Sequence, residues 1–235
     1  MGRIQANALR RAGAPKASRS LTPRADTLTE QAYRLIEEQI VTLRLKPADV
    51  LSEQMLSASF DIGRTPIREA LQRLAREGLI TILPRKGILV SDINPRSQLL
   101  VLEVRREIER LLSRAGAERA TKQQREQLQE IAKGMDRAAK TNNDLEFMRL
   151  DRELNQLVID CAHNDFAARS MKLLQGLSRR FWYMHYREAA DLPVCARLHA
   201  NQARAIAQGN RDAAARATDK LMDYVEAFTR ATVTV

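Results

Sequence analysis

The sequence predicts a mainly α-helical protein with an N-terminal helix-turn-helix that carries a small β-hairpin wing, followed by a C-terminal antiparallel bundle of six or seven helices. Residues 51–87 place an apolar-periodic helix, a tight turn, a second helix and a strand-turn-strand in that order. From residue 96 onward, long helical patterns alternate with short polar breaks, and no strand pattern follows Val90. Aromatic residues make up only 4% of the 235 residues, which favours helix packing over sheets.

The chain is expected to divide into segments 1–27, 28–93 and 94–235. The first segment carries six Lys and Arg side chains and one acid, without apolar periodicity. It is predicted to be a disordered basic arm, with extra phosphate contacts to a nucleic acid as the alternative role. It has no apolar run suited to a secretory signal, and no later stretch suits a membrane span. The two cysteines form no CxxC motif, so we expect a cytoplasmic protein that does not bind membranes.

Segment 28–93 is expected to contain three helices and two strands, whose positions follow from apolar periodicity and turn residues. The expected elements are a helix over 32–40, a helix through Met55, Leu56 and Phe60, a tight turn at 61–63, a helix after that turn, and strands over 79–83 and 88–90 around a turn at 84–87. Thr65 is the expected N-cap of the third helix, and Pro66 its first residue, where a missing N–H costs nothing.

The third helix has the side chains expected of a helix that reads duplex DNA. Arg64, Thr65 and Arg68 lie in its first turns, the end that enters the major groove in a helix-turn-helix. Arg73 lies later, where contact with phosphate is favoured. The opposite face is apolar at three- and four-residue spacing and comprises Ile67, Ala70, Leu71 and Leu74. Because residues 28–93 carry nine basic and nine acidic side chains, this prediction depends on where the arginines lie, and the overall charge of +10 adds little. The alternative is that these arginines form a solvated helix surface and do not contact DNA.

These residues resemble the N-terminal domain of the GntR family of bacterial transcription regulators over roughly residues 29–92. The matching pieces are Ala32–Ile40, Leu51–Glu53, Arg64–Leu71, Glu77–Leu79 and Pro84–Gly87. The resemblance implies base and phosphate contacts by the recognition helix, and a wing that flanks the minor groove. The implied DNA-binding residues, together with the phosphate contact expected at Arg73, are Arg64, Thr65, Arg68, Arg85, Lys86 and the wing glycine Gly87. Many relatives carry an arginine where this chain has Gln54.

Segment 94–235 is predicted to be entirely helical. Helices are expected near 96–119, 122–140, 143–162, 165–189, 194–208 and 211–232. The breaks between them consist of cap and stop residues, at Thr121, Asn142-Asn143, His163-Asn164, Asp191–Pro193 and Gly209-Asn210. Cys161 and Cys195 lie within these helical patterns and are expected to pack in the core.

This segment resembles the FadR-type C-terminal effector domain over roughly residues 97–232. The resemblance is carried by Glu103–Glu109, Ala117–Thr121, Leu150–Asn155, His199 and Gly209-Asn210. Many such domains hold a divalent metal through one Asp and three His. The resemblance places Asp151 and His199 at two of these positions, whereas Asn155 and Leu221 occupy the other two. An amide is a poor zinc ligand and leucine is none, so no tightly bound metal or other cofactor is expected. A hydrogen-bonded interior histidine is the alternative role for His199.

The resemblance also implies a site for a small organic-anion effector. Arg105 aligns with the arginine that relatives use to clamp an effector carboxylate, although Glu109, one turn later, offers an internal partner. The remaining candidates for this site are Asp151, Asn155, His199, Tyr183 and Arg187. Tyr183 and Arg187 belong to an aromatic run over 179–187, which we interpret as core or dimer contact in preference to a pocket wall.

Together these features predict a DNA-binding transcription regulator, a repressor in the usual manner of the family. It is expected to bind an inverted-repeat operator in double-stranded DNA as a homodimer and to respond to an organic acid. The alternative from another class is an enzyme built on Asp151, Asn155, His199 and Arg105. The sequence offers it no Ser or Cys nucleophile beside a base and no phosphate-binding glycine loop. A nonspecific nucleic-acid-binding protein is the third possibility.

Overall fold

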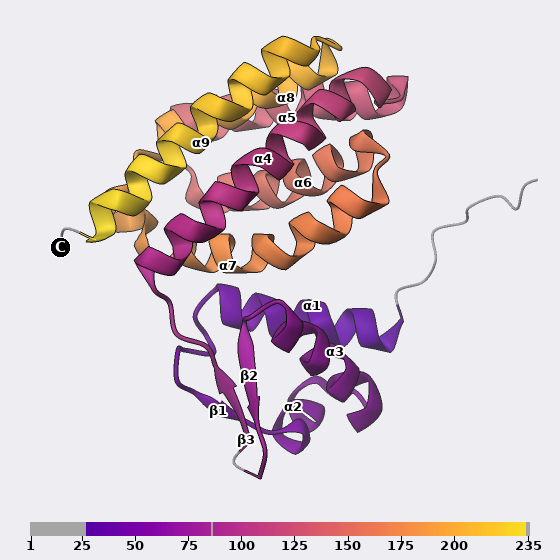
Figure 1. Cartoon of the computed structure of the whole chain (residues 1–235), viewed down its shortest axis with the longest axis vertical. Helices are drawn as coiled ribbons and strands as arrows, with labels where there is room; N and C mark the ends of the chain where they lie inside the picture. The colour runs from indigo at the N-terminus through magenta and orange to yellow at the C-terminus, as the bar shows by residue number, and fades with distance from the viewer. Residues whose placement is uncertain (1–26, 86, 234–235) are drawn as a thin grey trace, which may run out of the picture.

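The computed structural model describes residues 27–85 and 87–233, which form a small winged domain and a larger helical bundle (Figure 1). The predicted basic arm, apart from Thr27, lies outside the described residues. The winged domain contains α1 (Leu28–Val41), β1 (Val50–Leu51), α2 (Glu53–Phe60), α3 (Arg64–Arg76), β2 (Ile80–Leu83) and β3 (Gly87–Val90). The three helices and the hairpin are therefore confirmed, and the predicted apolar face of α3 is buried against the domain core.

The sheet has a third strand that the sequence pattern did not indicate. β1 pairs antiparallel with β3, so the strand order is β1-β3-β2 instead of a two-stranded hairpin. With only two residues, between the turn at Ala48 and the N-cap Ser52, β1 is too short to show an alternating pattern. Its role is to tie the segment before α2 to the wing.

The start of α3 differs from the prediction by one residue. The helix begins at Arg64, and its N-cap is Gly63, which makes no side-chain capping bond. Thr65 is therefore not the N-cap, and Pro66 is the third helical residue. Pro66 is still tolerated because the first N–H groups of a helix have no intrahelical acceptor. The preceding helix α2 ends at Asp61, which is left-handed with φ 53° and makes the tight turn.

The second domain contains six helices among the described residues. They are α4 (Pro95–Arg119), α5 (Lys122–Thr141), α6 (Asp144–Ala162), α7 (Asp165–Ala189), α8 (Leu192–Ala207) and α9 (Arg211–Val233). Each predicted helix is present, with ends within two residues of those expected. The pairs α5 with α8 and α4 with α9 make the most extensive contacts, and Ala-rich faces of α5 and α8 build much of the core. None of the described helices combines the length and apolar composition needed to cross a membrane.

The predicted breaks act as caps. The Thr121 hydroxyl accepts a hydrogen bond from Gln124 N, and the Gln124 side chain accepts one from Thr121 N, which completes a capping box. Asn143, Asn164 and Asp191 cap α6, α7 and α8 through their side-chain oxygens. These local bonds fix where each helix starts, which is why the sequence predicts the bundle closely.

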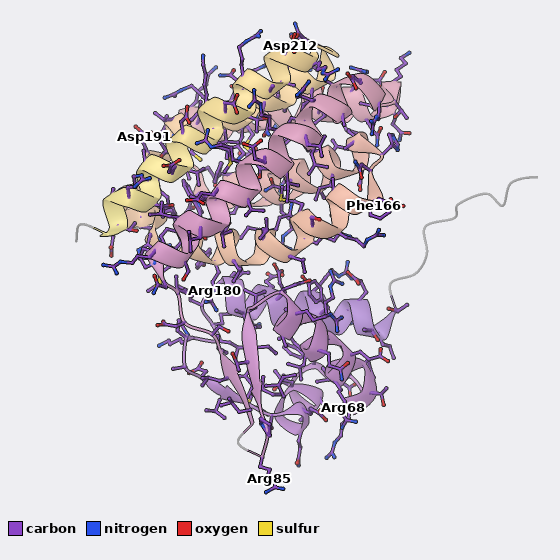
Figure 2. All side chains as sticks on the ribbon, viewed as in Figure 1. Arg68, Arg85, Phe166, Arg180, Asp191 and Asp212 are labelled. Atoms are coloured by element: carbon purple, nitrogen blue, oxygen red, sulfur yellow. The ribbon has the colours of Figure 1, made fainter. Side chains whose placement is uncertain are left out.

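The two domains meet where α1 of the winged domain lies along α7 of the bundle (Figure 1). At this interface, a leucine of each domain packs against a glycine of the other. A Cβ atom on Gly176 of α7 would lie 2.8 Å from Leu79 Cδ1, and one on Gly78 would lie 3.9 Å from the Leu177 methyl carbons. Leu79 therefore approaches the α7 backbone more closely than a Cβ would allow, whereas the contact of Leu177 with Gly78 has an ordinary van der Waals length. The Arg180 guanidinium is buried at this junction and donates to the Asp92 carbonyl in the inter-domain linker (Figure 2).

Candidate functional site

The first candidate site is the exposed surface of α3 and the wing. Arg64, Thr65 and Arg68 are all exposed, as the sequence predicts, while the opposite face of the helix is buried. Arg85 is exposed at the wing turn, and it lies with Arg64 and Arg68 around one shallow concave surface. Figure 2 shows Arg68 and Arg85 at the end of the winged domain that points away from the bundle. A long polyanion can reach this surface without meeting the second domain.

Arg68 already has a protein partner on this surface. Its Nε and Nη2 atoms donate to the two carboxylate oxygens of Glu53, each at 2.7 Å. Both side chains are substantially exposed, so solvent weakens the pair. Glu53 and Gln54 of α2 line the same concave surface. Arg64 has no ion pair among the described residues. Unlike Arg68, it can therefore contact DNA without breaking an ion pair.

Arg73 has a structural role that the sequence analysis missed. Its guanidinium carbon lies 3.5 Å from the centre of the Tyr33 ring, and its nitrogens donate to Glu30 and Glu77. Because only 29% of the side chain is exposed, Arg73 is held within the domain and joins α3 to α1. The phosphate contact of Arg73 stays a prediction, and it would have to compete with Glu30 and Glu77 for the guanidinium. Glu77 is buried, and the Tyr33 hydroxyl also donates to it.

The wing turn depends on backbone conformations that favour glycine. Gly87 has φ +102°, and a Cβ atom there would lie 3.1 Å from Val50 Cγ1. Gly87 is thus needed for the close approach of β1 and β3, and its expected part in DNA binding is to shape the wing. Arg85 has φ 63°, which turns its exposed side chain outward at the tip (Figure 2). Lys86, the other predicted wing cation, lies outside the described residues.

The second candidate site is a cavity of about 390 Å³ between the bundle and the end of α1. Most of its walls come from α6, α7, α8 and α9, and the winged domain contributes residues from α1 and the turn after it. Five of the six predicted effector-binding residues line it, namely Arg105, Asp151, Asn155, Tyr183 and His199. Arg187 does not. Its side chain is 78% exposed and donates to the Tyr186 hydroxyl, so the cavity gives no support to its predicted part in effector binding, which stays a prediction.

Asp151, Asn155 and His199 form one hydrogen-bonded group in the cavity wall. Asp151 Oδ1 lies 3.1 Å from His199 Nε2 and accepts a hydrogen bond from Asn155 Nδ2 at 3.0 Å. The other ring nitrogen of His199, Nδ1, lies 2.9 Å from the Cys195 carbonyl oxygen. A ring that donates to both oxygens is an imidazolium. Burial opposes this charge, but the contacts with Cys195 and Asp151 outweigh it and hold the pKa of His199 well above its ordinary value.

This arrangement does not fit a tightly held divalent metal. One carboxylate oxygen already accepts from both Asn155 and His199, and the Asn155 amide turns its nitrogen toward it. Within residues 27–85 and 87–233, no three His, Cys, Asp or Glu side chains are placed to share a metal ion. Leu221, at the position expected for the last ligand, is buried but does not line the cavity, whereas Val225 and Phe228 of the same helix do.

Arg105 lines the cavity but is paired internally, which was the open alternative. Its Nη2 atom lies 2.5 Å from Glu109 Oε1 and its Nε atom 2.7 Å, with both side chains largely buried. The second Glu109 oxygen has no hydrogen-bond partner among the described residues. The guanidinium edge that faces away from Glu109 remains for a ligand.

The aromatic run of α7 forms part of the cavity wall. Phe181, Trp182 and Tyr183 line it, and Phe181 and Trp182 also pack in the core as expected, so core packing and the pocket wall are not exclusive alternatives here. Phe181 and Trp182 also contact Phe228 of α9, with ring centres 6.0 and 4.7 Å apart. These aromatic residues of α7 therefore line the cavity and also pack against neighbouring helices. Helical spacing could not separate these two roles.

Cys195 is the cavity residue that sequence reasoning assigned only to the core. It is buried one turn before His199, with its Sγ atom 3.7 Å from Nδ1, so a cysteine does lie beside a histidine, although both ring nitrogens of that histidine already donate. Nδ1 donates to the Cys195 carbonyl, and burial raises the pKa of the thiol. The thiol therefore stays protonated and is a poor nucleophile. The i,i+4 spacing of Cys195 and His199 was the available signal.

Comparisons with known proteins cover both parts of the chain. The family described as bacterial regulatory proteins, gntR family, matches residues 28–90, and the FCD domain matches residues 100–224. The chain belongs to the GntR family of bacterial regulatory proteins. A curated relative, the HTH-type transcriptional repressor RspR of Escherichia coli, is 28% identical over 200 residues, covering 85% of this chain and 88% of that protein.

Solved structures share the fold of this GntR-family protein. E. coli McbR/YncC matches with a TM-score of 0.76 at 18% identity, over 89% of this chain and all of that one. A putative GntR regulator from Rhodococcus sp. RHA1 matches with a TM-score of 0.63 at 17% identity, over 86% of this chain and 97% of that one. The GntR and FCD matches make the protein a DNA-binding transcription regulator with an effector-type domain, as the sequence predicted.

Proposed function

We propose that the protein is a sequence-specific repressor that binds an inverted-repeat operator as a homodimer and is controlled by an organic anion. The observation that carries the DNA part is the exposure of Arg64, Thr65 and Arg68 on one face of α3, at the end of the molecule that also holds Arg85. Bidentate arginine contacts with guanine are the commonest specific contacts in a major groove. Arg85 suits the adjacent groove or backbone.

Three exposed apolar side chains on α4 support the dimer. Leu100, Val104 and Leu111 are 64%, 53% and 49% exposed, and their spacing of four and seven residues puts them on one face of the helix. A second copy is the proposed partner, because an inverted repeat presents two identical half-sites and a two-fold interface pairs the same face of each subunit.

The cavity supports control by a small anion. It has a volume within the range of small-molecule sites, combines aromatic walls with arginines, and reaches the winged domain. An effector bound there can shift the population of DNA-binding conformations if it prefers one of them. We propose binding without turnover, because the cysteine beside His199 is a protonated thiol and supplies no activated nucleophile.

Binding to the DNA upstream of the protein's own gene and its neighbours tests this function. Fluorescence anisotropy with that DNA and with a scrambled duplex should show tighter binding to the former at the same salt concentration. Arg64→Ala should weaken specific binding by about 1–3 kcal/mol and reduce the preference between duplexes. Arg216→Ala, which removes an exposed arginine from α9, is the control. Equal affinity for both duplexes would favour the nonspecific nucleic-acid-binding alternative.

A further inference from the structure

The cavity belongs to both domains. Glu38, Val41, Thr42 and Arg44 of the winged domain line it together with residues of the bundle. Thr42 is the C-cap of α1, and Leu43, with φ 58°, turns the chain so that Arg44 follows at the cavity edge. A molecule that fills the cavity therefore contacts the domain that carries the recognition helix.

The cavity wall has an excess of positive charge. Five arginines line it, namely Arg44, Arg105, Arg149, Arg152 and Arg179, against the two carboxylates of Glu38 and Asp151. Arg105 and Arg149 pair with Glu109 and Glu153, which lie outside the lining. Arg152 and Arg179 pair with Glu38 and Glu37, so Arg44 is the lining arginine without an ion pair among the described residues. Arg44 is exposed, and its guanidinium favours an anionic occupant.

One of these arginines also holds the two domains together. Arg179 Nη1 on α7 donates to Glu37 Oε1 on α1 at 2.6 Å, and the side chains are only 21% and 11% exposed. The neighbouring pair of Arg152 with Glu38 is longer, at 3.7 Å, and about half exposed. The Arg179–Glu37 pair is thus the stronger ionic contact between α1 and the bundle. Because Arg179 lines the cavity, an anion there competes with Glu37 for the same guanidinium.

We propose that an aromatic carboxylate in the cavity bridges Arg44 and Arg179 and replaces the Glu37–Arg179 ion pair, so that ligand binding exchanges the direct ion pair between α1 and α7 for a contact made through the ligand. This rests on the proposed function of the cavity as the effector site. The aromatic body is indicated by the wall of Phe147, Phe181, Trp182 and Phe228. A compound with two carboxylates satisfies both arginines, one on each domain, whereas a monocarboxylate satisfies one.

The proposal separates the roles of the two winged-domain residues. Arg44 contributes affinity for the ligand, so its removal weakens binding. Glu37 competes with the ligand, so its neutralisation strengthens binding and at the same time loosens the docking of the domains. Because Glu37 and the ligand share Arg179, formation of the Glu37–Arg179 pair and binding of the ligand must oppose each other by the same factor.

The test titrates the purified full-length protein with benzoate and with isophthalate, a benzene ring that carries two carboxylates. Trp182 is the only tryptophan in the chain and lies in the cavity wall, so its fluorescence reports occupancy. Calorimetry gives an independent affinity. Isophthalate should bind more tightly than benzoate, and Arg44→Ala should remove most of that difference, weakening isophthalate about tenfold. Lys46→Ala, a nearby exposed cation that does not line the cavity, should change little.

Glu37→Gln should tighten isophthalate binding several-fold, whereas Glu126→Gln, an exposed acid remote from the cavity lining, should not. If Arg44→Ala has no greater effect than Lys46→Ala, or if Glu37→Gln fails to tighten binding, the bridging proposal is overturned. If neither aromatic acid binds at millimolar concentration, the ligand class is wrong. Operator affinity of the unliganded protein is measured in parallel. If the unliganded protein does not bind the operator, the proposed function is contradicted. The ligand titrations still test the bridging proposal independently.

Discussion

Replacing Glu53 with Gln tests whether Arg68 contacts DNA. Glu53 accepts hydrogen bonds from the Nε and Nη2 atoms, one edge of the Arg68 guanidinium, in the free protein, at 2.7 Å each. Because the Arg68 and Glu53 side chains are 60% and 30% exposed, the pair stabilises the domain little and can open on binding. The Glu53 carboxylate therefore acts as a competitor of DNA for Arg68, and it also repels the phosphates.

The size of the effect follows from the exposure of the pair. Opening an exposed ion pair lowers a binding constant by no more than about fivefold, and removing one negative charge beside the phosphates adds to the gain. We expect Glu53→Gln to tighten operator binding about three- to tenfold. Arg68→Ala should weaken it at least about tenfold if the guanidinium reads a base. In the Arg68→Ala background the Glu53→Gln change should gain less, because no guanidinium remains to be released.

The four proteins of this double-mutant cycle are compared by fluorescence anisotropy on the operator and on a scrambled duplex at one salt concentration. Glu69→Gln removes the same charge from α3, and Glu69 does not line the surface shared by Arg64, Arg68 and Arg85. It therefore measures the general effect of charge. Equal gains from Glu53→Gln in both backgrounds would show that only charge was changed. No gain in the wild-type background would refute the competition.

Other expectations concern stability, pH, metal and the arm. Arg73→Ala should lower the free energy of unfolding by about 1.5–3 kcal/mol in denaturant titrations, because it leaves buried Glu77 without its cation; a change in operator affinity without a change in stability would contradict this role. The pKa of His199 is raised in the folded protein. The His199–Asp151 pair therefore contributes its full stabilisation of the fold below pH 6.5, and this contribution is lost as pH rises through the folded-state pKa. His199→Gln should therefore cost about 3 kcal/mol at neutral pH and less in alkaline buffer, and a pH-independent difference would argue for a neutral ring. After dialysis, elemental analysis should find well under one metal ion per chain, while a stoichiometric metal would mean that the donor set is incomplete. Deleting residues 1–26, which keeps the α1 N-cap Thr27, should leave folding and operator preference intact and flatten the salt dependence of binding, and a truncated protein that fails to fold would show a structural role for the arm.

Elements specified by local chemistry could be predicted from the sequence. Thr121, Asn143 and Asn164 each cap a helix through a bond within three residues, so their identity alone locates the helix start. Strand β1 could not be predicted, because its two residues are fixed by pairing with β3 across 38 intervening positions from Val50 to Leu89. Gly63 replaces Thr65 as the N-cap of α3 for a similar reason, since a glycine leaves no side-chain signature.

The role of a site residue could be predicted where its position on a helix determines its exposure. It could not be predicted where contacts with other helices determine it. Arg64 and Arg68 are exposed because their helix position fixes them. Arg73 shares that helix, but Tyr33 and Glu30 of α1 capture it, and this depends on how α1 packs. The participation of Arg44 in the cavity likewise depends on how the two domains dock, which periodicity does not encode.

The two leucine-glycine contacts between the domains restrict how such proteins can be recombined. Leu79 follows α3 by three residues and sits on Gly176, where even a methyl group would come within 2.8 Å of it. A chimera that joins this winged domain to another effector bundle therefore fits without a shift of Leu79 only if a glycine stands at the facing position of that bundle's α7 equivalent. With a bulkier residue there, the winged domain would dock on the new bundle at a different angle. In the proposed dimer, the two recognition helices would then lie at a different spacing. Operator choice in a hybrid regulator would then depend on a position that never approaches DNA.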